Sequence, residues 1–227
     1  MVKDNQDFVN NTVSAKGQLK PNENVSFGER KGGKKVLFIG NSITRHGILE
    51  SIGWYKDCGM AASSVEKDYV HVATKQLKKK FGDIEYCIAQ LAEWEWNFLD
   101  DSVLYSFYQA KDFNADIIIV NLGGNVDIKD TEKDREEFLS ALLKMIRYFK
   151  GETKAKVIIC SQFWRRRFLD DQFYKASVIL KCDYVKLGDL GDKAENKAIG
   201  EYEHQGVQLH PNDLGMQRIA ERILEKI

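Results

Sequence analysis

The chain has 227 residues, of which 43% are hydrophobic, enough to bury the core of one medium-sized domain. Its 34 lysine and arginine residues balance its 34 aspartate and glutamate residues, so the formal net charge is zero. A chain without net charge has no overall field that would draw it to nucleic acid or to an anionic membrane surface. We therefore expect no nucleic-acid or membrane partner and look for a small or neutral ligand.

The sequence shows no pattern typical of secretion, membrane insertion or metal binding. Residues 1–6 lack the apolar core of a signal peptide, and no run approaches the ~18 apolar residues that a membrane span needs. We expect a cytoplasmic location, or secretion if a signal has been removed. The four cysteines are widely spaced without a C-x-x-C pair, so neither a zinc site nor a redox motif is indicated. We expect no metal and no organic cofactor. Nothing in the sequence indicates an oligomeric state.

The chain divides into a polar extension and one domain of alternating strands and helices. Residues 1–33 are rich in Asn, Lys and Gly without sustained periodicity, which indicates an extension or linker with a short edge strand over 24–27. From 34 to 227, apolar runs of strand length alternate with segments of helical period. The predicted strands are 36–39, 84–89, 116–121, 156–161 and 184–187, and the predicted helices are 67–80, 101–111, 131–149, 170–181 and 213–227. This alternation predicts a three-layer α/β/α domain around a mainly parallel five-stranded sheet.

Three polar side chains lie where the chain leaves this sheet. Ser42 follows the first strand of the domain and a glycine, as at a buried strand that ends in a tight turn. Asn125 follows the third strand, and His210 lies on the loop before the last helix. Because parallel strands place their carboxyl ends at one edge of the sheet, we expect the three side chains to project from the same edge.

Together these side chains supply the groups that serine catalysis needs. Serine is a weak nucleophile unless a base accepts its proton and fixed donors receive the oxyanion that develops on the attacked carbonyl. Ser42 is therefore the candidate nucleophile, His210 its base, and Asn125 a carboxamide donor to the oxyanion. The second strand ends at the same edge, where the backbone N–H of Ala92 could be a further donor.

These segments resemble the motifs of the SGNH (GDSL-like) hydrolases, a family of esterases, lipases and carbohydrate deacetylases on a flavodoxin-like fold. Gly40-Asn41-Ser42 is similar to the family's Gly-Asp-Ser block, and Gly123-Gly124-Asn125 to its Gly-x-Asn block. His210, in His-Pro-Asn-Asp, matches the family's base. The resemblance covers about 35–227 and implies that Ser42 also donates its own N–H to the oxyanion. Asn41 replaces the usual Asp, and Ala92 stands where the family usually has Gly.

The largest departure from the family pattern is Val207, which stands three residues before the histidine, where the family carries its acid. Valine cannot orient an imidazole. Either another carboxylate takes this role, with Glu95 favoured over Glu203 and Asp213, or a backbone carbonyl holds His210 in a Ser-His dyad. Loss of the orienting acid can cost up to about 10⁴ in turnover in a serine protease.

Other residues beside these motifs are candidates for lining the substrate site. This group comprises Asn41, His46, Gly124 and Trp164. His46 could equally be an inert loop residue, and His204 lies on the same terminal loop as His210. Trp164, with Trp54, Trp94 and Trp96, follows predicted strands and either forms an aromatic rim or covers the edge of the core. Asp213 is expected to cap the last helix.

The leading functional hypothesis is a serine esterase that acts through an acyl-serine intermediate. The resemblance implies a small-molecule or glycan ester as substrate, with O-acetyl esters of carbohydrates preferred. One alternative is acyl transfer from the same site to a sugar hydroxyl instead of water. The other is a carbohydrate-binding domain with impaired catalysis, which the valine at the acid position motivates.

Overall fold

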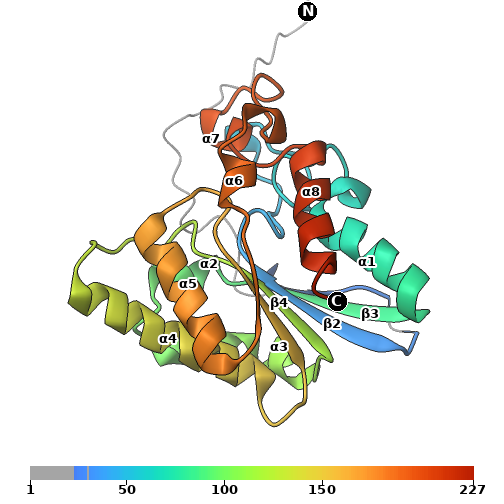
Figure 1. Ribbon diagram of the computed structural model, residues 1–227. Coiled ribbons are helices and arrows are strands. Elements are labelled where there is room, and N and C mark those ends of the chain that lie inside the picture. The colour runs from blue at the N-terminus through green and yellow to red at the C-terminus, as the bar shows by residue number, and fades with distance from the viewer. Residues whose placement is uncertain (1–22, 30) are drawn as a thin grey trace, which may run out of the picture.

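The computed structural model describes residues 23–29 and 31–227, and in it a six-stranded sheet lies between two layers of helices (Figure 1). The strand order is β1-β3-β2-β4-β5-β6. β1 runs antiparallel to β3, and all other neighbours are parallel. The strands are β1 (Val25–Phe27), β2 (Lys34–Gly40), β3 (Ile84–Gln90), β4 (Ile117–Asn121), β5 (Lys156–Cys160) and β6 (Asp183–Val185). The predicted three-layer, mainly parallel architecture is confirmed.

Each face of the sheet carries its own hydrophobic core, because alternate side chains of a strand point to opposite faces. In β2, Val36 and Phe38 pack into one core and Leu37 and Ile39 into the other, all fully buried. β4 and β5 are apolar in the same way on both faces. Such continuous apolar strands are typical of a parallel sheet that helices cover on both sides.

The helices divide between these two faces. The α-helices are α1 (Tyr69–Phe81), α2 (Ala92–Trp96), α3 (Tyr108–Asp112), α4 (Glu132–Lys150), α5 (Arg167–Leu180), α6 (Gly188–Gly191), α7 (Gln205–Gln208) and α8 (Asp213–Leu224). The 3-10 segments are η2 (Glu50–Ile52), η3 (Val65–Lys67), η4 (Asp101–Phe107) and η5 (Ala194–Asn196). Helices α1 and α8 cover one face, and α3, α4 and α5 cover the other (Figure 1). Among the described residues, no helix is both long and apolar enough to span a membrane.

The sheet has one strand more than the five predicted for the domain. β1 lies within the predicted extension 1–33, and Val25 and Phe27 pair with Ala89 and Cys87 of β3. This stretch of the predicted extension therefore forms one edge of the sheet, because its three residues pair with β3. The remainder of the extension, residues 1–22 and residue 30, lies outside the described residues.

The predicted helices are present, with two local differences. The segment 101–111 is a 3-10 helix, η4, that continues as the short α3, and the Asp100 side chain caps its start by accepting from Ser102 N at 2.9 Å. The predicted cap of α8 is wrong by one residue: Asn212 accepts from Gly215 N at 3.0 Å. Asp213 instead accepts from the backbone N and the Oγ of Ser63, at 2.8 and 2.6 Å.

Candidate active site

Ser42 lies in a tight turn directly after β2. The Asn41 carbonyl accepts hydrogen bonds from Thr44 N at 2.9 Å and Arg45 N at 3.0 Å, which closes the turn. Gly40 ends the strand, and a Cβ built on it would stand 1.7 Å from Thr44 Oγ1. Only glycine fits there. The turn thus holds Ser42 half-buried at the carboxyl end of a central strand, as the sequence predicts.

His210 reaches Ser42 from the segment between α7 and α8. Its Nε2 is 2.8 Å from Ser42 Oγ, and its Nδ1 is 2.7 Å from the carbonyl oxygen of Gly206. A carbonyl oxygen can only accept, so Nδ1 carries the proton and Nε2 offers its lone pair to the serine hydroxyl. This is the arrangement of a serine nucleophile and its base.

The histidine is oriented by a backbone carbonyl and not by an acid. The favoured acid, Glu95, does not orient His210: its carboxylate accepts hydrogen bonds from Asn41 Nδ2 at 3.1 Å, Gly123 N at 2.5 Å and Asn125 Nδ2 at 2.7 Å. That assignment of Glu95 is therefore wrong. Asp213 bonds to Ser63, and Glu203 is exposed. The dyad held by a backbone carbonyl, the other alternative left by the sequence, is the arrangement present.

Two donors are placed for an oxyanion. Asn125 follows β4 in a loop that Gly123 turns with φ +114°, a conformation that favours glycine. One N–H of the Asn125 amide goes to Glu95, which leaves the second N–H as a donor. The Ser42 N–H has no hydrogen-bond acceptor among residues 23–29 and 31–227. Both groups can therefore serve a developing negative charge, as predicted.

The third predicted donor, Ala92, is already engaged. Its N–H donates to Gln90 Oε1 at 3.1 Å, because the Gln90 side chain turns back to the start of α2. Ala92 is buried, with 7% of its surface exposed. In this arrangement Ser42 N and the second N–H of Asn125 Nδ2 are the predicted donors that remain available to an oxyanion.

Two of the predicted lining residues gather beside the dyad. A Cβ on Gly124 would lie 3.0 Å from the Trp164 ring and 3.1 Å from Asn41 Nδ2, so these three residues are packed together. The rings of Trp164 and His210 meet edge to face with centroids 4.8 Å apart. Trp164 and Gly124 are half-buried and border the site. Asn41 is only 2% exposed and stabilises the turn that carries Ser42.

The remaining histidine and tryptophan candidates are mostly interior. His46 is only 3% exposed, and its Nδ1 donates to the Gly47 carbonyl at 2.6 Å. Trp54 and Trp94 are buried in the two cores, at 0% and 1% exposure, and Trp96 is half-buried in α2. Trp164 is the tryptophan whose ring contacts His210. His204 caps α7 by accepting from Val207 N at 3.4 Å. Both His46 and His204 are close enough to His210 to lower its pKa slightly.

The pKa of His210 suits a base that is neutral at ordinary pH. Burial lowers it to about 4, while the hydrogen bond to Gly206 acts in the opposite direction. A neutral imidazole with its proton fixed on Nδ1 is ready to accept a proton at Nε2.

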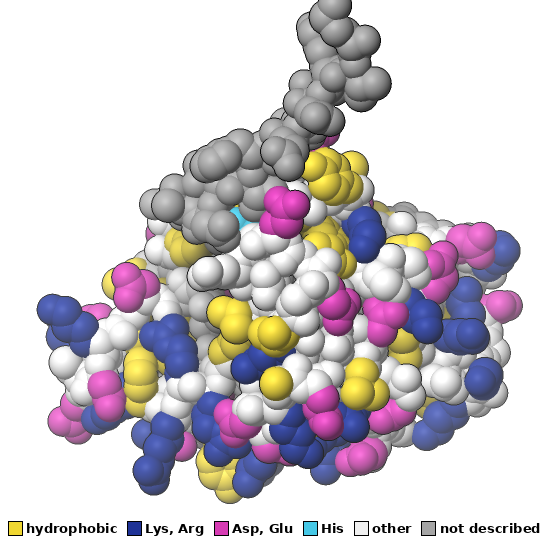
Figure 2. All heavy atoms as spheres, turned by 90° about the horizontal axis from the view of Figure 1, so that it is seen from above, with side chains coloured by type: hydrophobic (Ala, Val, Ile, Leu, Met, Phe, Trp, Pro, Cys, Tyr) yellow, Lys and Arg dark blue, Asp and Glu magenta, His cyan; other side chains and the backbone are white. Residues whose placement is uncertain are grey.

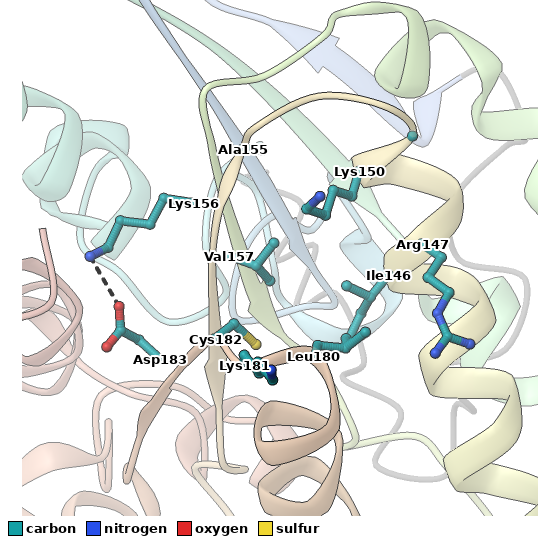
Figure 3. A pocket seen from close by; sticks show the side chains of 11 residues that line it. Ile146, Arg147, Lys150, Ala155, Lys156, Val157, Leu180, Lys181, Cys182 and Asp183 are labelled. Atoms are coloured by element: carbon teal, nitrogen blue, oxygen red, sulfur yellow. Dashed lines mark ion pairs between the residues drawn. The ribbon is translucent and has the colours of Figure 1, made fainter.

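The described residues also line surface pockets away from Ser42 and His210. A pocket of about 650 Å³ opens at the end of the sheet opposite Ser42, between the end of α4, the starts of β5 and β6 and the end of α5 (Figure 3). Its Lys156 and Asp183 form an ion pair at 3.0 Å. Among the described residues, no group of three or more His, Cys, Asp or Glu side chains is placed to hold a metal ion. On the face of the molecule that Figure 2 shows from above, acidic and basic side chains are interspersed, in keeping with the balanced composition.

Comparison with known proteins gives a fold relationship. No protein-family model and no curated protein sequence matches the chain. Among solved structures, a lipase/acylhydrolase from Enterococcus faecalis superposes with a TM-score of 0.53 at 17% identity, over 86% of this chain and 95% of that one. A protein assigned as a GDSL-like lipase from Bacteroides uniformis has a TM-score of 0.55 at 16% identity, over 87% and 96%.

A third neighbour is larger than this chain. It is a two-domain esterase active on acetylated mannans, with a TM-score of 0.53 and 15% identity over 85% of this chain. The match covers 48% of that esterase, so this chain spans about half of its length. The three likenesses extend over 85–87% of this chain at 15–17% identity, so they show a shared fold. The chain has the fold of the SGNH (GDSL-like) hydrolases.

Proposed function

We propose that the protein is a serine esterase of the SGNH type that hydrolyses carboxylic esters through an acyl-serine intermediate. The observation that carries this proposal is the 2.8 Å contact between Ser42 Oγ and His210 Nε2, with the His210 proton held on Nδ1 by Gly206. As Ser42 Oγ attacks the ester carbonyl, Nε2 takes the hydroxyl proton and later returns it to the leaving alcohol. Water then repeats the sequence on the acyl-serine and releases the acid.

The transition state carries its negative charge on the former carbonyl oxygen. Ser42 N–H and the second N–H of Asn125 would receive this charge, and fixed donors of this kind are commonly the largest contribution to acyl-transfer catalysis. Both donors sit on backbone segments that are fixed at the ends of adjacent parallel strands, β2 and β4. They therefore need little reorganisation when the charge develops.

The backbone carbonyl of Gly206 is expected to support catalysis less strongly than a carboxylate would. In a serine protease, replacing the acid by a neutral amide costs about 10⁴ in kcat because the histidine adopts the wrong tautomer. The Gly206 carbonyl keeps the right tautomer, since it can only accept from Nδ1. It lacks the full charge that stabilises imidazolium, so we expect a working but slower esterase.

O-acetyl esters of carbohydrates are the substrate class we favour. One structural neighbour is described as active on acetylated mannans, and the exposed part of Trp164 offers an aromatic surface beside His210 on which a sugar ring could pack. Acyl transfer to a sugar hydroxyl would use the same residues and would appear as an acetylated acceptor among the products.

A glycan-binding domain with impaired catalysis is the second candidate. The carbonyl of Gly206 in place of an acid favours it. A carbohydrate esterase with a TM-score of 0.54 and 14% identity, 62% of which the match covers, is described as displaying divergent catalytic and non-catalytic binding functions at its active site. Ester hydrolysis by the folded protein distinguishes the esterase from the glycan-binding domain.

Labelling with a fluorophosphonate tests the proposal without knowledge of the natural ester. We expect wild type to form one covalent adduct, located at Ser42 by mass spectrometry, and to release acetate from acetylated manno-oligosaccharides. Ser42→Ala is the matched control and should remain unlabelled. A folded wild-type protein that takes no label and hydrolyses no ester, yet binds glycans, would overturn the esterase in favour of the binding domain.

The activity should persist into acid solution. Protonation of Nε2 removes the lone pair that accepts the serine proton, so kcat/KM falls as pH decreases through the pKa of His210 in the free enzyme. Since burial holds that pKa at about 4, the acid limb should lie near pH 4 and not near the ordinary 6.5. The measurement is kcat/KM for p-nitrophenyl acetate from about pH 3.5 to 8, with circular dichroism confirming the fold at each pH. An inflection between about pH 6 and 7 would contradict the burial argument.

A further inference from the structure

Glu95 is a buried carboxylate at the centre of the site that the dyad does not use. It lies in α2 between two tryptophans, is 1% exposed, and accepts its hydrogen bonds from groups on two different loops. Burying a carboxylate is costly unless several donors satisfy it. Its position therefore calls for an explanation beyond helix formation.

The donors to Glu95 come from the two segments that build the oxyanion hole. Oε1 accepts from Asn41 Nδ2 at 3.1 Å and from Gly123 N at 2.5 Å. Oε2 accepts from Asn125 Nδ2 at 2.7 Å. Asn41 closes the turn that carries Ser42, and Gly123 turns the loop that carries Asn125. One carboxylate thus joins the nucleophile turn after β2 to the donor loop after β4.

This contact also fixes which end of the Asn125 amide is available. A carboxamide can rotate by half a turn and exchange its NH₂ group with its oxygen at little intrinsic cost. A rotated Asn125 would place its oxygen against the Glu95 carboxylate, two acceptors facing each other, which is unfavourable. Glu95 therefore selects the orientation in which the NH₂ group is shared between the carboxylate and the site.

We propose that Glu95 is the positioning residue of the oxyanion hole: it holds one N–H of Asn125 so that the other is available to the developing oxyanion. This role rests on the proposed esterase activity. Burial raises the pKa of Glu95, whereas the hydrogen bonds from Asn125, Gly123 and Asn41 act in the opposite direction. The side-chain and backbone groups that contact this carboxylate are all donors, which matches its ionised form.

Glu95→Gln tests the proposal because it keeps the size of the side chain and removes its selectivity. Glutamine offers both a donor and an acceptor, so it can pair with either orientation of Asn125. We expect kcat per fluorophosphonate-titrated site to fall by about 10- to 100-fold, less than the ~10²–10³ that follows loss of an oxyanion donor, with KM within about twofold. Glu93→Gln, in the same helix with a 3.4 Å contact to Asn24, is the matched control and should keep wild-type kcat.

A double-variant comparison separates positioning from general destabilisation. If Glu95 acts through Asn125, Glu95→Gln should cost less than about threefold in an Asn125→Ala background. Losses that multiply in the double variant would overturn the proposal, as would a Glu95→Gln protein with wild-type kcat. Glu95→Asp, which keeps the charge and shortens the reach, covers the case in which the glutamine variant fails to fold: its kcat should fall by about tenfold, and an unchanged value overturns the proposal.

The same experiments distinguish this inference from the function on which it rests. A wild-type protein that takes no label and cleaves no ester overturns the esterase and the role of Glu95 together. A wild type that is labelled and active, with Glu95 variants that are equally active, overturns the positioning role alone.

Discussion

Ser42→Ala and His210→Ala should each lower kcat for p-nitrophenyl acetate by about 10⁴-fold or more. The first removes the atom that forms the acyl-enzyme, and the second removes the base 2.8 Å away that accepts its proton. Because the two act as one unit, the double variant should be little slower than either single variant. The measurement is steady-state hydrolysis, corrected for the buffer rate.

The two variants should differ in stability, which provides an internal control. Ser42 is half-buried, and among the described residues its hydroxyl hydrogen-bonds to His210, so Ser42→Ala should retain the wild-type melting temperature. His210 also donates to Gly206 and packs against Trp164, so His210→Ala should melt somewhat lower. Residual hydrolysis within about tenfold of wild type in a folded Ser42→Ala protein would contradict a serine mechanism.

The sequence could predict those residues of the site whose positions follow from the ends of predicted strands. Ser42 and Asn125 each follow an unmistakable apolar strand, and β2 and β4 are neighbours in the sheet. The turn and the loop that follow them must therefore meet at one edge. His210 is predictable because a short loop places it immediately before a strongly amphipathic last helix, α8.

The orienting group of His210 could not be read from the sequence because it is a backbone carbonyl. Any residue could supply it, so Gly206 leaves no side-chain signature. Val207, at the expected acid position, is instead a fully buried core residue. The short α7, four residues long, presents the Gly206 carbonyl to Nδ1, and a helix of that length has too few residues to show a period.

Side-chain contacts that cross between loops were also beyond the sequence. Glu95 stands out as an acid in the segment Ala92-Glu93-Trp94-Glu95-Trp96, but its neighbour Glu93 carries the same signal and is less buried. Only the geometry shows that Glu95 meets Asn125 and not His210. Likewise, nothing in the composition of β3 reveals that the Gln90 side chain occupies the Ala92 N–H.

Asn125→Ala should lower kcat by about 10²- to 10³-fold, equivalent to roughly 3–4 kcal/mol of transition-state stabilisation, with a much smaller change in KM. The reason is that the amide donates to an oxygen that becomes fully charged only in the transition state, so the ground-state complex loses little. The variant should still take the fluorophosphonate label, more slowly, because Ser42 and His210 are untouched. Steady-state kinetics with p-nitrophenyl acetate separates kcat from KM.

The matched control is Asn97→Ala, an exposed asparagine after α2 whose amide donates to the Glu93 carbonyl at 2.9 Å. It should retain wild-type kcat. A loss in Asn125→Ala that falls on KM alone would mean that the amide binds the ground-state ester and not the oxyanion. A loss below about threefold would mean that Ser42 N–H carries the charge without it, and Glu95 would then have no donor to position.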